Sequence, residues 1–333
     1  MKQTERQETD VLIVGGSLEG CIAAASLAKA GRKVLLTLRE GSLGGAATGG
    51  LEVSLFCEKI KEPRAAAYAE ELLEKAGRAE GTKGPLFHDQ RCKLVLAQML
   101  EAAGVTVLSH IFPFEVKQEE EEIVCLAECK TETLEIHSRA LVDAEPYGAV
   151  LAMAGIPWQP GSSKAYGAIK WNGIPTQALA EALEPGSICG EGFLIGMLQP
   201  EFSWKKNGII CGTEAFRCFH SSDFGETIMA GIPITLPDFS IFTLSRAEIA
   251  LRGYAYRLRD TLRKTRQGFE KASIIHIAPQ VEWYGTRRFA EKRRGRLFSI
   301  GLEEYTNEKA IEAGVACADL VQDFLEKEEQ EEK

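Results

Sequence analysis

Residues 10–38 read DVLIVGGSLEGCIAAASLAKAGRKVLLTL and contain two apolar runs joined by a glycine turn and an alanine-rich segment. The runs Asp10 to Val14 and Lys33 to Leu38 are typical of buried parallel strands. Between them, Glu19 to Ala30 has a helical pattern that stops at Gly31. A strand, a glycine turn, a helix and a second strand within about 30 residues predict a βαβ unit. We therefore expect an α/β, Rossmann-like fold built on a parallel sheet.

The turn between the first strand and the helix is GGSLEG, Gly15 to Gly20. In dinucleotide-binding folds the first glycine makes a tight turn, a second lets the backbone approach a diphosphate, and a third lets the helix pack on the strand. The helix N-terminus then directs its amide groups at the phosphates. Gly15, Gly16, Ser17 and Gly20 are therefore candidate cofactor-binding residues.

Several side chains near this turn differ from what a dinucleotide requires. Ser17 replaces the middle glycine, so we expect its Cβ and hydroxyl to stand where a diphosphate oxygen comes close. Glu19 would repel a diphosphate if it pointed inward. The acidic ribose clamp falls on Leu38, which accepts no hydrogen bond, and Glu40 either replaces it through a shifted loop or is a solvated loop acid. The missing clamp makes NAD(P) the weaker alternative, since Arg39 suits only a 2′-phosphate.

The patterns along the rest of the chain predict one discontinuous domain and an inserted region. Three strand-like pieces within 114–137 predict an antiparallel meander, and 140–144 returns to the parallel sheet. The expected divisions are a flexible tail at 1–9, a dinucleotide-binding domain at 10–149 and 273–326, a substrate-side region at 150–272, and a disordered acidic tail at 327–333.

Composition excludes several classes of function. The formal net charge of the 333 residues is -9, which argues against a nucleic-acid binder that neutralises phosphates. The sequence has no apolar run long enough for a transmembrane helix and no secretory signal, so we expect no membrane partner. Nine cysteines without a framework spacing fit a reducing cytoplasm. No Cys or His pair stands at zinc-ligand spacing from Cys125 and Cys129, and we expect no metal site.

With these residues laid out, the chain resembles the FAD-dependent oxidoreductase family of the glutathione-reductase-like superfamily. Leu43 to Gly50, LGGAATGG, resembles the family's LGGTATGG loop, and Leu141 to Gly148, LVDAEPYG, resembles its VIDATGDG element. The other similar segments, in the family's order, are Leu151–Pro157 with AALAGAP, Gly196–Pro200 with MQP and Thr286–Phe289 with TRRIVG. The resemblance implies noncovalently bound FAD, with Gly44, Gly45, Thr48 and Ala144 near it.

The departures from the family concern residues that face the nucleotide. Glu145-Pro146-Tyr147 replaces the Thr-Gly-Asp of the family's turn. Of the closing AGD or AGR element near the flavin, only Gly301 remains, within Ser299 to Glu304. Gly301 and Glu40 are therefore further cofactor-binding candidates. The apolar scaffold resembles the family more closely than the residues that face the nucleotide do.

Candidate catalytic residues lie in the second half of the chain. His220, in a loop-like run, is a candidate proton donor, and Arg287 and Arg288 could bind an anionic substrate or pair with acids across a domain seam. Cys57 has no second cysteine nearby for dithiol exchange and is expected to be a buried thiol.

Two functions remain open from the sequence. The first is a cytoplasmic FAD-dependent oxidoreductase acting on a small organic substrate. The second is a non-catalytic paralogue of the same fold, with weak or no FAD binding, that acts as a partner or regulatory subunit. The oligomeric state stays open between a homo-oligomer and a hetero-oligomer.

Overall fold

The structure is a computed structural model that describes residues 4–161, 164–238, 240–283, 287–302 and 304–331. It confirms the predicted βαβ unit, formed by β1 (Thr4–Val14), α1 (Leu18–Lys29) and β2 (Val34–Leu38). The two strands are parallel, with Ile13 opposite Leu36. The small side chains of α1 let neighbouring helices approach it closely, and its residues from Leu18 to Ala25 are buried.

The parallel sheet that contains this unit has the strand order β17-β18-β6-β1-β2-β3. β6 pairs in parallel with β1 and β18, and β2 pairs in parallel with β3. The added strands are β3 (Thr106–Ser109), β6 (Thr133–Asp143), β17 (Arg293–Arg294) and β18 (Leu297–Ser299).

The antiparallel meander predicted within residues 114–137 is confirmed. β4 (Phe112–Gln118) pairs with β5 (Ile123–Glu128), which pairs with the first half of β6. One continuous strand therefore leaves the meander and enters the parallel sheet, ending beside β1 at Asp143.

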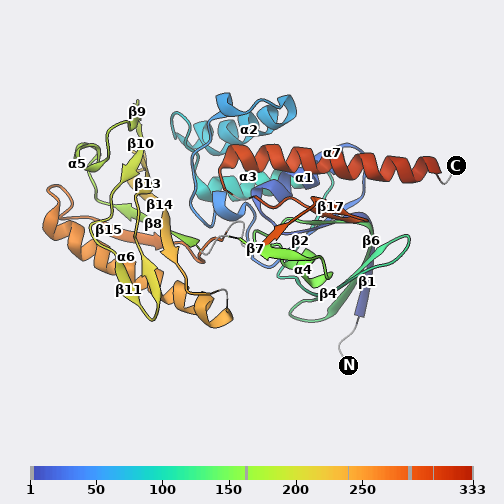
Figure 1. Cartoon of the computed structure of the whole chain (residues 1–333). Helices are drawn as coiled ribbons and strands as arrows, with labels where there is room; N and C mark the ends of the chain where they lie inside the picture. Colours follow the sequence, from blue (N-terminus) through green and yellow to red (C-terminus); the bar gives the residue numbers. More distant parts are fainter. Residues whose placement is uncertain (1–3, 162–163, 239, 284–286, 303, 332–333) are drawn as a thin grey trace.

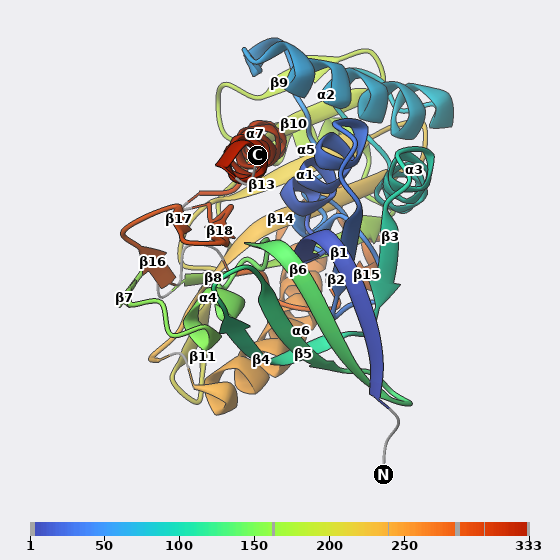
Figure 2. The ribbon, with the colours of Figure 1, turned by 90° about the vertical axis from the view of Figure 1, so that its right-hand side faces the viewer.

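The two faces of this sheet are covered by different elements, which follows from the alternation of side chains along β1. Val11 and Ile13 lie in one core cluster with the helices, and Leu12 and Val14 lie in another with the meander. Figures 1 and 2 show the helices gathered on one side of the sheet. These helices are α1, α2 (Pro63–Ala76), α3 (Asp89–Ala102) and α7 (Asn307–Glu331), whereas α4 (Ala149–Met153) contributes to the cluster with the meander.

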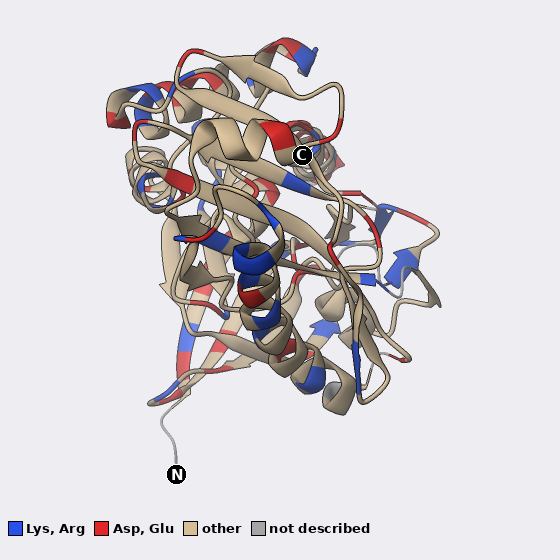
Figure 3. Cartoon of the chain, turned by 90° about the vertical axis from the view of Figure 1, so that its left-hand side faces the viewer, with Lys and Arg blue, Asp and Glu red and all other residues tan. Residues whose placement is uncertain are grey.

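A second, antiparallel sheet lies beside the first and carries α6 (Ile241–Thr265) on one face (Figure 1). Its core cluster includes Leu251, Tyr254 and Leu258 of α6, whereas Arg252 and Arg257 of this helix are exposed; Figure 3 marks its Lys and Arg positions in blue. The strands are β8 (Lys164–Asn172), β9 (Ile188–Gly190), β10 (Phe193–Leu198), β11 (Trp204–Lys206), β12 (Ile209–Cys211), β13 (Phe216–Ser221), β14 (Glu226–Thr235) and β15 (Ser273–Ile277).

The remaining elements are short. A two-stranded ribbon joins β7 to β16, and α5 follows β8 in the chain. Their bounds are β7 (Trp158–Pro160), β16 (Arg287–Phe289), α5 (Thr176–Ala182), η1 (Gly45–Ala47), η2 (Cys57–Lys59) and η3 (Arg78–Glu80).

Three expectations about the ends of the chain and the division between its parts differ from the structure. Residues 4–9, expected to be a flexible tail, pair with β6. The expected disorder of 327–333 is wrong for residues 327–331, which continue α7 because Glu328 and Glu329 find arginine partners. Ser273–Ile277 was assigned with the dinucleotide-binding part, yet it pairs with β8 in the second sheet. Residues 332–333 lie outside the described residues.

No helix among the described residues combines the length and the apolar composition that crossing a bilayer demands.

Candidate functional site

The glycine turn brings the ends of β1 and β6 and the start of α1 into contact. Gly15 has φ +120°, and a Cβ there would lie 2.5 Å from the carbonyl carbon of Ala144. A Cβ on Gly20 would lie 2.4 Å from the carbonyl oxygen of Gly15. Only glycine fits either position, as the sequence analysis expects for the tight turn and for helix–strand packing.

Ser17 is the N-cap of α1, and its side chain is turned into this corner. Its Oγ donates to the carbonyl of Ala144 at 3.0 Å and accepts from the amide of Gly20 at 3.3 Å. The hydroxyl thus satisfies the helix start and a buried carbonyl. The hydroxyl is therefore engaged within the corner, while Ser17 also lines the cavity described below.

The glycine-rich loop after β2 folds directly onto the turn. The amide of Gly44 donates to the carbonyl of Gly16 at 2.7 Å, and Gly44 has φ +99°. Thr48 donates to the carbonyl of Leu43 at 2.6 Å, which closes the loop into a compact turn. The structure therefore brings Gly44, Gly45 and Thr48 together with the first glycine turn.

A cavity of about 210 Å³ lies between the turn, the loop and the end of β6, and we call it the corner cavity. Seven of the ten predicted cofactor residues line it, namely Gly15, Gly16, Ser17, Glu40, Gly45, Thr48 and Ala144. Gly20 and Gly44 support its walls from behind. Gly301 does not line the cavity; it is exposed, and its amide donates to Ser299 Oγ at 3.2 Å.

Carboxylates dominate the charge of the corner cavity. Glu19, Glu40, Glu145 and Glu282 line it, and none of the described residues that line it is Lys or Arg. Burial raises the pKa of Glu19 to about 7 and that of Glu145 to about 8. Arg39 lies 3.9 Å from the Glu145 carboxylate and lowers the pKa of Glu145 by less than burial raises it. Sequence reasoning named Glu19 as a charge near the helix start but could not establish its burial.

The corner cavity lacks the usual ribose clamp, as the sequence indicates. Leu38 is buried, and its Cδ1 would lie 2.7 Å from a Cβ on Gly16, so its side chain packs over the turn. Glu40 is half-buried at the cavity wall, within reach of a bound ligand.

A second cavity of about 370 Å³ adjoins the first, and we call it the inter-sheet cavity. Both cavities are lined by Glu282 and Tyr305, which are buried. Arg217 of β13 lines the inter-sheet cavity and donates to Glu52 at 2.7 Å, and Met197 of β10 lies in the same wall. Sequence reasoning missed these residues because they come from separate segments and form no short-range motif.

The predicted catalytic residues do not converge. His220 is buried with its Nδ1 2.9 Å from Thr227 Oγ1 and its Nε2 2.8 Å from Thr176 Oγ1, and it lines neither cavity. Burial lowers its pKa, which favours the neutral ring. Arg287 donates to the carbonyl of Tyr147 at 2.8 Å, while Arg288 follows it on β16 with an exposed side chain. Thr286, quoted in the family-like segment, lies outside the described residues.

Arg287 lines a separate pocket of about 430 Å³ with Arg39, Trp158 and Trp283. Its guanidinium lies 5.0 Å from the ring centre of Trp158. Arg287 therefore lines neither the corner cavity nor the inter-sheet cavity.

The family model of FAD-dependent oxidoreductases matches residues 10–324, which is nearly the whole chain. The chain belongs to this family. FAD is the cofactor of FAD-dependent oxidoreductases, as the resemblance implied. No curated protein sequence matches the chain.

Several solved structures share its fold at low sequence identity. A flavoprotein/dehydrogenase from Cytophaga hutchinsonii is 15% identical with a TM-score of 0.62, covering 96% of this chain and 79% of that one. p-Nitrophenol 4-monooxygenase PnpA from Pseudomonas putida DLL-E4 is 14% identical with a TM-score of 0.60 and the same coverage. The flavin-dependent monooxygenase PieE, solved with FAD and substrate, is 14% identical with a TM-score of 0.58, covering 93% of this chain and 56% of that one. These likenesses establish the fold.

The residues of the corner cavity fit the diphosphate of FAD on one condition. The glycine turn and the N-terminus of α1 form the wall that a diphosphate requires, and the loop from Gly45 to Gly49 faces it. The buried Glu19 carboxylate lies on the same wall, so the fit holds when Glu19 is neutral.

Proposed function

We propose that this chain is an FAD-dependent oxidoreductase that holds FAD noncovalently from the corner cavity toward the inter-sheet cavity and acts there on a small organic substrate. One observation carries the proposal. The two cavities share Glu282 and Tyr305 in their walls, one lies at the glycine turn, and the other lies between the two sheets. A cofactor anchored in the first can therefore reach a substrate in the second.

The roles of the chain's own residues follow from their positions. Gly15, Gly16 and Ser17 would hold the diphosphate with main-chain groups at the start of α1. Arg217, fixed by Glu52, would orient a polar group of the substrate, and the buried Tyr305 would keep water from the junction. FAD, when bound, supplies the transfer of a hydride or of electrons. No His or Cys occurs among the described residues that line the two cavities, which agrees with noncovalent binding.

The absorption spectrum of the purified protein tests the proposal. We expect flavin bands after incubation with FAD and desalting, with all of the flavin released on denaturation. Anaerobic mixing with small organic reductants should then bleach those bands for at least one compound class. A protein that remains colourless at every pH from 6 to 9 would overturn the proposal and favour the non-catalytic paralogue.

A further inference from the structure

Glu19 is a buried carboxylate with an unsatisfied oxygen at the start of α1. It is the second residue of the 12-residue helix, is 5% exposed, and lines the corner cavity beside Gly16 and Ser17. Its Oε2 has no hydrogen-bond partner. Ser17 donates its hydroxyl proton to the carbonyl of Ala144, and burial raises the pKa of Glu19 by more than Ser17 and the Glu19 amide lower it. Such a group is costly when ionised, unless a ligand or a proton compensates it.

The groups that face Glu19 are neutral or acidic. Cys21 lies on its own helix, Tyr305 comes from the segment before α7, and Gly314 of α7 packs against its carbonyl. Around these groups stand further thiols and acids, namely Cys92, Glu40, Glu52, Glu145 and Glu282. Because none of these groups is a cation, no described residue that lines the cavity compensates the charge of an ionised Glu19.

An ionised Glu19 would repel an anionic ligand in the corner cavity, and a proton bound to the Glu19 carboxylate removes this repulsion. The start of α1 favours a negative group at the place that the Glu19 carboxylate already faces. Two negative charges within a few ångströms in a poorly solvated site repel strongly. A protonated carboxyl instead offers one O–H donor to a phosphate oxygen.

We propose that Glu19 makes the binding of a diphosphate ligand in the corner cavity depend on a proton. One proton passes from solvent to the Glu19 carboxylate as the ligand binds and returns to solvent as it leaves. The inference rests on the proposed function, with FAD as the diphosphate ligand. Since FAD is a diphosphate diester that stays ionised through neutral pH, the titrating group belongs to the protein.

The direction of the effect follows from the charge of each state. Glu19 titrates near neutrality in the ligand-free protein, so FAD affinity should be highest on the acid side and fall as pH rises. Because each pH unit above the pKa reduces the protonated fraction tenfold, the dissociation constant should rise about 30-fold between pH 6.0 and 8.5. Glu19→Gln keeps the size and an N–H donor but cannot ionise, so its FAD affinity should be nearly constant over the same range.

Quenching of FAD fluorescence measures the affinity across this range. The wild type, Glu19→Gln and Glu101→Gln are titrated with FAD at each pH; Glu101 is an exposed acid on α3 and controls for the loss of one negative charge. Calorimetry at pH 7.5 in buffers of different ionisation enthalpy should show uptake of up to one proton by the wild type and by Glu101→Gln. Glu19→Gln should take up none.

Each outcome separates this inference from the proposed function. Wild-type binding that weakens with pH while Glu19→Gln does not would support the inference. FAD binding by the wild type that is independent of pH would overturn it and leave the oxidoreductase function standing. A Glu19→Gln variant that keeps the wild-type slope, while Glu145→Gln loses it, would also overturn it and assign the proton to Glu145. Failure of every variant to bind FAD at any pH would overturn both.

Discussion

At the scale of single residues, Glu145 couples folding stability to pH. Burial raises its pKa from 4.5 to about 8, so the folded state holds a proton that the unfolded chain releases. Its contribution is complete below pH 4.5 and is lost as pH rises through about 8. Glu145→Gln should therefore match the wild type near pH 4.5 and exceed its free energy of unfolding by about 3 kcal/mol at pH 7 and about 5 kcal/mol above pH 8. Urea unfolding at pH 5, 7 and 9 checks this, and equal stabilities at pH 9 would contradict it.

The orientations and partners of single side chains were the features that the sequence predicted least well. The glycines at 15 and 20 follow from the strand–turn–helix pattern, because the packing that requires them is local. The direction of the Ser17 hydroxyl depends on Ala144, which is 127 positions away, and no pattern within the turn reveals it. Asp89 is another such case. It follows the N-cap His88 at the start of α3, and its ion pair with Lys170, 81 positions away, leaves no pattern near the helix start.

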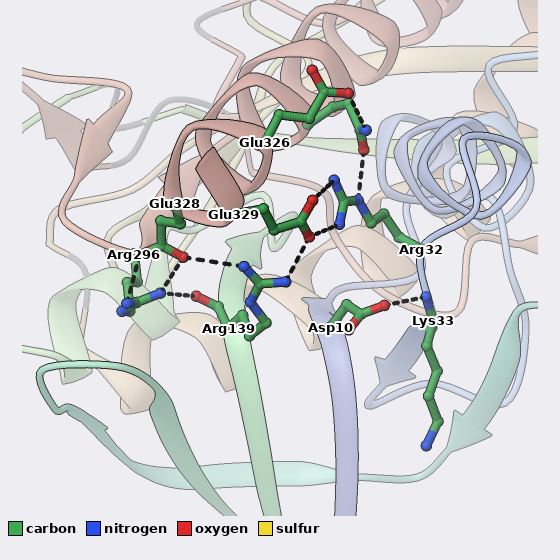
Figure 4. A network of polar contacts seen from close by, with 9 residues as sticks. Asp10, Arg32, Lys33, Arg139, Arg296, Glu326, Glu328 and Glu329 are labelled. Carbon is green, nitrogen blue, oxygen red and sulfur yellow. Dashed lines mark hydrogen bonds and ion pairs between the residues drawn. The ribbon is translucent and has the colours of Figure 1, made fainter. Parts of the chain in front are cut away.

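At the scale of elements, α7 is held to the parallel sheet by ion pairs along its last turns (Figure 4). Glu329 pairs with Arg32 and Arg139, and Glu328 pairs with Arg296 at 2.6 Å. The charge run of KEEQEEK suggested disorder because acidic repeats repel one another in isolation. The arginines that reverse this outcome lie far away in the sequence, so only the assembled fold brings them together.

Removal of Arg296 tests the contribution of this network. Arg296 also donates to the carbonyls of Glu120 and Arg139, and its side chain is only 11% exposed. Arg296→Met should lower the free energy of unfolding by about 1–2 kcal/mol, and the loss should shrink at high salt. Arg294→Met, at an exposed neighbour on β17, should change it by less than about 0.5 kcal/mol. Equal effects of the two substitutions in urea titrations would contradict the prediction.

At the scale of the whole molecule, a buried ion pair joins the second sheet to helix α3, which covers the first sheet. Lys170 of β8 donates to Asp89 of α3 at 2.6 Å and lies 3.1 Å from Glu226 of β14. The sequence predicted the dinucleotide-binding unit from its strand and helix periodicity, and it indicated a second region where the pattern becomes less regular. It could not predict how the two meet, because the pairing of Lys170 with Asp89 spans 81 residues and leaves no pattern in either segment.

Loss of Lys170 should destabilise the molecule as a unit. Lys170→Met leaves the Asp89 carboxylate, which is 2% exposed, without its cation, so the free energy of unfolding should fall by about 3–5 kcal/mol. The double variant Lys170→Met, Asp89→Leu should recover most of this loss, because it leaves no buried charge at that point. Urea unfolding followed by fluorescence measures both. If the double variant is no more stable than Lys170→Met, the loss of stability comes from packing and not from the unpaired charge.

The contact between the first and last helices also bears on how the chain matures during synthesis. Gly314 of α7 packs on Ile22 and on the main chain of Glu19, so this side of α1 is covered by residues made almost 300 positions later. Until α7 has been made and has docked, this side of α1 is open to water. The corner at the start of α1 therefore reaches its full packing late in the folding of the chain.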